Sequence, residues 1–123
     1  MIDNTDVDPS ALARLRRMGG PEFVVKMIDL FIEEIPSRLA AARQGEQVGN
    51  WTAVADGAHS IKSSAMNFGA QTLSEIALKI EMDARAGKTA EIPTLLRKLE
   101  QAYQTAKVWL DNQTPFGQQQ RNR

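Results

Sequence analysis

Helical periodicity runs through most of this 123-residue chain. Apolar residues recur at intervals of three and four, which places them on one face of an α-helix, and no convincing run of strict apolar–polar alternation indicates a strand. Gly and Pro interrupt the pattern at positions where helices commonly begin or end. The sequence therefore predicts an all-α fold.

These interruptions separate a short first helix from a long second one. Asp8 is a suitable N-cap for the short helix, which has Pro at its first position and stops at Gly19–Gly20. Pro21 opens the long helix, Pro36 predicts a kink within it, and Gly45 predicts its end.

Three further helices follow with short links between them. Asn50 can cap the third helix. Thr72 and Glu75 have the spacing of a capping box for the fourth, which ends before Gly87. The last helix is expected over about residues 90–112.

Four long helices joined by short links predict an up-and-down antiparallel four-helix bundle, with the additional short N-terminal helix packed on one end. We assign residues 8–112 to this bundle domain, 1–7 to an N-terminal arm and 113–123 to a disordered tail. The residues expected to face the core are Val24, Ile28, Phe31, Ile35, Leu39 and Ala42; Trp51, Val54, Ala58, Ile61, Ala65 and Phe68; Leu73, Ile76, Ala77, Ile80 and Ala84; and Ile92, Leu96, Leu99, Tyr103, Ala106 and Leu110.

Composition excludes several function classes. Lys plus Arg and Asp plus Glu each total 15, so no net charge attracts the chain to nucleic acid or to a membrane surface. There is no Cys and only one His, which excludes disulfides, thiolate catalysis and the common zinc sites. The acidic N-terminus is unlike a secretory signal, and no apolar run is long enough to span a bilayer, so we expect a cytoplasmic protein.

The single histidine, His59, falls off the apolar stripe of its helix and is expected to face solvent. Ala55 and Ser63 lie one turn before and after it, Ser60 is adjacent, and Met66 lies two turns on. Most of these side chains are small, so they predict a low surface on which a partner protein could reach the imidazole.

Lys62 is three residues from His59, where its ammonium could approach an anion attached to the ring. An imidazole nitrogen is a competent nucleophile near neutral pH, and a nearby cation offsets the charge of an arriving phosphoryl group. This arrangement suits a phosphoryl carrier. Spacing alone leaves open that His59 is an ordinary exposed histidine and Lys62 an ordinary solvated charge.

A second apolar stripe on the long helix is formed by Phe23, Met27 and Leu30. If this helix is next to the His59 helix, part of the stripe could remain exposed as a docking surface for a partner. The alternative is that these residues only widen the core-facing side of the helix.

The stretch "AHSIKSSAMNFGA", residues 58–70, resembles the signature of histidine-containing phosphotransfer (Hpt) domains, A-H-x-L-K-G-S-x-x-x-x-G-A. His59, Lys62, Ser64 and the Gly69–Ala70 pair fall in register with it. The segments "GGPEFVVKMIDLFIEEIPSRLAAAR" and "LSEIALKIEMDARAG" are also similar to helices of that family, the latter to its "L...A..LE...R.G" pattern, and the resemblance covers about residues 8–110. Ser63 departs from the pattern, which usually has Gly there, but Ser is small and keeps the surface low.

The resemblance implies a phosphorelay intermediate without autonomous ATP-dependent kinase activity. His59 would accept a phosphoryl group from the aspartyl phosphate of one response-regulator receiver domain and pass it to another, with Lys62 stabilising the group. A hybrid sensor histidine kinase would be a further partner. No cofactor is expected on this chain, and Mg²⁺ is expected on the partner receiver; no "GxxxxGK[ST]" loop for ATP is present.

Two alternatives remain open at this stage. One is an Hpt-like helical interaction module that binds receiver domains without accepting phosphate. The other is the dimeric stem of a histidine kinase, in which an ATP-binding domain would phosphorylate the same histidine. Short links between helices of one chain favour a monomer over such a stem.

Overall fold

A computed structural model describes residues 7–113. The predictions of an N-terminal arm and of a disordered tail concern mostly residues 1–6 and 114–123, which lie outside the described part. The described residues form a four-helix, all-α structure, which confirms the predicted fold class. The helices are α1 (Pro9–Val48), α2 (Trp51–Asn67), α3 (Gln71–Arg85) and α4 (Ile92–Gln113).

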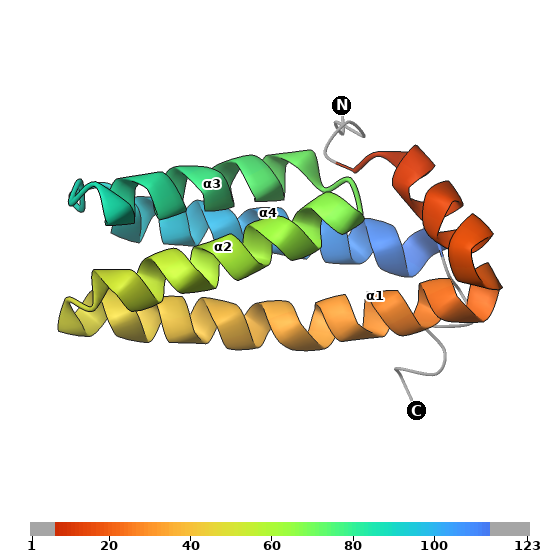
Figure 1. Ribbon diagram of the computed structural model, residues 1–123, viewed down its shortest axis with the longest axis horizontal. Coiled ribbons are helices and arrows are strands. Elements are labelled where there is room, and N and C mark those ends of the chain that lie inside the picture. Colours follow the sequence, from red (N-terminus) through yellow and green to blue (C-terminus); the bar gives the residue numbers. More distant parts are fainter. Residues whose placement is uncertain (1–6, 114–123) are drawn as a thin grey trace.

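The helices form an up-and-down bundle in which α2 packs against α1 and α3, and α4 packs against α3 and α1 (Figure 1). The predicted apolar stripes meet in the middle as one continuous core, with only Trp51 and Ile76 half-buried. The Tyr103 hydroxyl reaches the core with its polar atom satisfied, because it donates to the Ile32 carbonyl at 3.1 Å. Burial raises the pKa of Tyr103 to about 12, so its hydroxyl stays a donor at neutral pH.

The first part of α1, residues 9–19, turns across the end of the bundle and is called the lid below (Figure 1). Its predicted start is confirmed: the Asp8 carboxylate accepts from the Ser10 N–H at 2.9 Å. The lid ends at Gly20, whose φ of 84° is the left-handed geometry that Gly adopts without steric cost. The sequence therefore located both ends of the short helix correctly.

The lid is held on the link between α2 and α3. The Asp8 N–H donates to the Gly69 carbonyl at 2.8 Å, and Arg14 donates to the Asn67 carbonyl at 3.2 Å. Gly69 has a φ of 64°, and a Cβ there would lie 2.7 Å from the Asp8 Cβ. Val7 is buried and forms an isolated bridge with Ala70. Gly69 and Ala70, the last two residues of the sequence motif, thus form the surface on which the lid packs.

The predicted end of the long helix at Gly45 is wrong. The helix continues to Val48 and is capped by Gly49, whose φ is 74°. Gly45 instead lies where α1 and α2 approach closely, since a Cβ there would be 2.9 Å from the Asn50 carbonyl oxygen. Its lack of a side chain serves helix packing and not helix termination.

Two other local predictions are also corrected. Thr72 is not an N-cap, because α3 begins at Gln71 with Ala70 in the cap position and no side-chain cap hydrogen bond. Ala70 is fixed there by the tight link, in which its N–H donates to the Ala65 carbonyl at 2.9 Å. In α1 the sharp change of direction is at Gly20, whereas Pro36 keeps helical dihedral angles.

Candidate functional site

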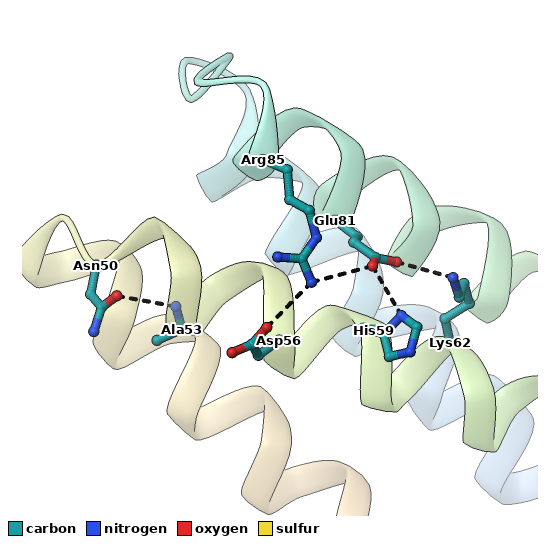
Figure 2. Close-up of polar contacts among 7 residues, drawn as sticks. All are labelled: Asn50, Ala53, Asp56, His59, Lys62, Glu81 and Arg85. Atoms are coloured by element: carbon teal, nitrogen blue, oxygen red, sulfur yellow. Dashed lines mark hydrogen bonds and ion pairs between the residues drawn. The ribbon is translucent and has the colours of Figure 1, made fainter.

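His59 lies on the side of α2 that faces α3, with its imidazole ring at the surface. Its side chain is 54% exposed, which confirms the expectation that it faces solvent. The ring Nδ1 is 2.9 Å from Oε2 of Glu81, a carboxylate carried by α3 (Figure 2). The two helices therefore present the ring in a defined orientation.

The hydrogen bond to Glu81 determines which ring nitrogen is free. Burial raises the pKa of Glu81, but the hydrogen bonds and the charges of Lys62 and His59 together lower it by more, so the net pKa lies below its usual value. The carboxylate is therefore ionised at neutral pH and can only accept a hydrogen bond. The hydrogen of the neutral ring must then be on Nδ1, which leaves a lone pair on Nε2.

Glu81 also organises the cations around the ring (Figure 2). Lys62 donates from Nζ to Oε1 of Glu81 at 3.1 Å, and the lysine side chain is only 22% exposed. Arg85 donates to Asp56 at 3.2 Å and approaches Glu81 at 3.5 Å. One carboxylate thus holds the imidazole and an ammonium group on its two oxygens, with a guanidinium group beside them.

The start of α2 is fixed by its predicted cap. The Asn50 side chain accepts from the Ala53 N–H at 3.1 Å (Figure 2). A Cβ at Gly57 would lie 3.3 Å from the Arg38 carbonyl oxygen, so α2 packs closely on α1 two residues before His59. These contacts fix the start of α2 and its packing on α1, while the packing of α2 on α3 brings His59 beside Glu81.

Residues 26–109 match the family model of the Hpt domain. The chain belongs to the Hpt domain family. It is 27% identical over 105 residues to the phosphorelay protein LuxU of Vibrio vulnificus, in strain YJ016 and in strain CMCP6; each match covers 82% of this chain and 91% of the relative. The crystal structure of histidine-containing phosphotransfer protein B (HptB) from Pseudomonas aeruginosa PAO1 superimposes with a TM-score of 0.86, covering 92% of this chain and 97% of that one at 25% identity.

Family membership gives this Hpt domain a general role as a phosphotransfer intermediate, and its phosphorelay relatives imply kinases and response regulators as the general class of partner. Hpt phosphorelay carriers are not kinases. Within residues 7–113, no cluster of three or more His, Cys, Asp or Glu side chains suits a metal ion. In the same range no helix is both long and apolar enough to cross a membrane.

The surface predicted around the histidine of this Hpt domain is only partly as expected. Ser63 and Met66 are exposed, and Ser60 is half-buried. Ala55 is wrong as a member of this surface, because it is fully buried. The buried face of α2 is wider than the spacing of its apolar residues predicted, because α1 covers one side of α2 and α3 covers the other. The exposed side chains beyond His59 are therefore those of Ser63 and Met66, toward the C-terminal end of α2.

The second apolar stripe of α1 is mostly used in packing. Phe23 and Met27 are half-buried and contact the core, and Leu30 is 40% exposed. Phe23 and Met27 therefore fit the alternative in which the core-facing side of the helix is wide. Their role in docking stays a prediction.

Sequence reasoning missed Glu81 and Arg85 as site residues. Both belong to the segment that resembles the "L...A..LE...R.G" helix of the family, in which they are the Glu and the Arg. That pattern was a usable signal for their importance. It carried no indication that the carboxylate would contact the imidazole, since 22 residues separate the two in the chain.

Proposed function

We propose that His59 accepts a phosphoryl group from the aspartyl phosphate of a response-regulator receiver domain and passes it to a second receiver domain. The observation that carries this proposal is the hydrogen bond between Nδ1 of His59 and Glu81. It orients a half-exposed ring so that the lone pair of Nε2 is available to an incoming group.

The transfer is an in-line displacement at phosphorus. The Nε2 lone pair forms the new N–P bond as the P–O bond to the partner aspartate breaks, and the aspartate leaves as a carboxylate. The ring, which keeps its Nδ1 hydrogen, becomes positively charged, and the adjacent Glu81 carboxylate offsets that charge. The reverse displacement, by an aspartate of the second receiver, returns the ring to its neutral form.

Lys62 and Arg85 are the cations that we assign to the phosphoryl group. Both contact the carboxylate that holds His59, at 3.1 and 3.5 Å respectively. Phosphoryl transfer depends mainly on positioning and on stabilisation of charge, which a cation that turns from Glu81 toward the phosphoryl group would supply. The partner receiver would supply Mg²⁺, the reacting aspartate and a lysine of its own, so this chain needs neither a cofactor nor ATP. A monomer in the cytoplasm, served by a hybrid sensor kinase, fits this role.

The decisive experiment mixes the protein with phosphorylated receiver domains and Mg²⁺ and measures acid-labile phosphate on this chain. We expect His59→Gln to abolish uptake and to change the free energy of unfolding by less than about 0.5 kcal/mol, since the ring is at the surface. Thr52→Ala, an exposed change on the same helix, is the control and should retain wild-type uptake. Acid-labile phosphate on the His59→Gln variant would contradict the site. A wild-type protein that binds receivers but takes up no phosphate would instead indicate an interaction module.

The role of Lys62 is tested in the same assay. Lys62→Ala should slow transfer about tenfold or shorten the lifetime of the phosphohistidine, because a cation beside the developing charge is removed. Lys98→Ala removes an exposed lysine of α4 and serves as the control for net charge. Rates and lifetimes equal to those of the control would show that Lys62 only holds Glu81.

A further inference from the structure

The helix α3 carries a second face, outside the core, that continues the site away from α2. Leu78, Glu81, Met82 and Arg85 have the spacing i, i+3, i+4, i+7, which places them on one side of the helix. Glu81 and Arg85 belong to the polar cluster at His59, so the two apolar side chains lie directly beside that cluster.

Leu78 and Met82 are unusually exposed for apolar residues at such a position. Their exposed fractions are 41% and 60%. Among the exposed large hydrophobic side chains of residues 7–113, no other two lie one helical turn apart on the same helix. With neighbouring side chains they form a shallow groove, whose lining residues are Lys62, Leu78, Glu81, Met82, Arg85 and Ala86.

We propose that this groove on α3 is a docking surface for the receiver domain that exchanges a phosphoryl group with His59, with Leu78 and Met82 as its apolar contacts. The inference rests on the proposed function and extends it to partner selection. The groove shares Lys62 and Glu81 with the site, so a domain that brings its reactive group to Nε2 of His59 must lie next to it.

Charge complementarity indicates the chemistry of the occupant. The charged lining residues are Lys62, Arg85 and Glu81, so the cations outnumber the carboxylate beside the apolar part even though both are paired with it. A domain that holds Mg²⁺ does so with carboxylates, so its reactive centre is acidic. An apolar side chain beside such a centre would enter between Leu78 and Met82, while the carboxylates face the two cations.

The test measures transfer rate against receiver concentration, using the receiver domain that transfers fastest from a panel phosphorylated with acetyl phosphate. Met82→Asp and Leu78→Asp should each raise the half-saturating receiver concentration about tenfold or more and leave the limiting rate nearly unchanged. Val108→Asp is the matched control, because Val108 is 58% exposed on α4, which packs against α3 and α1. Met82→Leu should retain wild-type behaviour, since it keeps an apolar side chain of similar size.

Phosphoramidate separates this proposal from the proposed function. In that reaction Nε2 bonds to phosphorus and ammonia leaves, so no docking is needed, and all the variants should be labelled as fast as wild type. Wild-type half-saturation in both Asp variants, with normal labelling and normal transfer by the wild-type protein, would overturn the docking surface and leave the relay function intact. No transfer from any receiver to the wild-type protein would overturn both.

Two other results would also contradict the groove as the docking site. One is a rise in the half-saturating concentration for Leu30→Asp with none for Met82→Asp, which would move docking to α1; Leu30 is 40% exposed and matches Leu78 in size and exposure. The other is a dimer of the wild-type protein that Met82→Asp converts to a monomer without any change in transfer, as measured by analytical ultracentrifugation. That result would assign the groove to a second copy of this chain.

Discussion

One side of α2 is buried and the other is polar, and the two sides are stabilised in different ways. Val54, Ala58 and Ile61 are fully buried against the rest of the core. On the other side, His59 and Lys62 meet a carboxylate of α3 and remain partly exposed. The buried side contributes mainly apolar burial, whereas partly exposed ion pairs contribute little to stability.

Folding and phosphoryl chemistry should therefore be separable by substitution on this helix. The buried side should determine whether the protein folds, and the polar side whether folded protein reacts. Substitutions on the buried side should lower the stability of the fold and leave transfer per folded molecule unchanged. Substitutions on the polar side should slow transfer and leave stability nearly unchanged.

The largest effect is expected for Ile61→Ala on the buried side. Ile61 is completely buried, so truncation should lower the free energy of unfolding by about 2–5 kcal/mol through lost burial and an internal cavity. Transfer measured per folded molecule should stay close to wild type. Urea denaturation combined with the receiver assay checks both quantities, and a transfer defect larger than the unfolded fraction would show that the two sides of α2 are coupled.

The buried side was predictable from sequence because it depends on a repeat within one helix. The stripe on α4 from Ile92 to Leu110 illustrates this, since every predicted position is buried. The polar side was less predictable because its contacts join two helices. Spacing could place His59 at the surface, but only the packing of α3 on α2 brings Glu81 to it.

The glycines of α1 also show that contacts between helices cannot be predicted from local sequence. Local sequence rules treat Gly as a helix terminator, which holds at Gly20 and Gly49. Gly45 has another cause, the close approach of α2, and that approach is a tertiary contact that no local pattern contains. The end of α1 was misplaced for this reason.

An intermediate effect is expected for Ser63, an exposed residue one turn beyond His59. Ser63→Arg places a long side chain where a receiver would approach and should slow transfer at least about tenfold, with a change in stability below about 0.5 kcal/mol. Ser63→Gly should transfer at least as fast as wild type but lose about 0.5–1 kcal/mol of stability, since Gly is unfavourable within a helix. Transfer reactions quenched at set times measure the rate, and thermal melts on the same samples measure stability. Wild-type transfer by Ser63→Arg would show that receivers do not approach over this surface.

The smallest effect in free-energy terms is the change in acid stability expected for Glu81→Gln; transfer by this variant is a separate quantity, because Glu81 orients His59. Lys62 and His59 hold the net pKa of Glu81 below its usual value despite burial, which raises it. A carboxylate whose pKa is lower in the folded than in the unfolded protein stabilises the fold at pH values above its unfolded pKa, and this stabilisation is lost as the pH falls through its folded pKa.

Gln carries no charge at any pH, so the Glu81→Gln variant should lose less stability than wild type between about pH 6 and about pH 3. The difference should be less than about 1 kcal/mol for a pair of this exposure. Urea denaturation across that range measures the difference. Asp56→Asn is the control, because Asp56 is 67% exposed and ion pairs between such exposed side chains contribute little to stability. Its acid profile should therefore follow wild type. An acid profile of Glu81→Gln that also coincides with wild type would mean that the carboxylate contributes to the orientation of His59 without stabilising the bundle, and the polar side of α2 would then be separate from folding altogether.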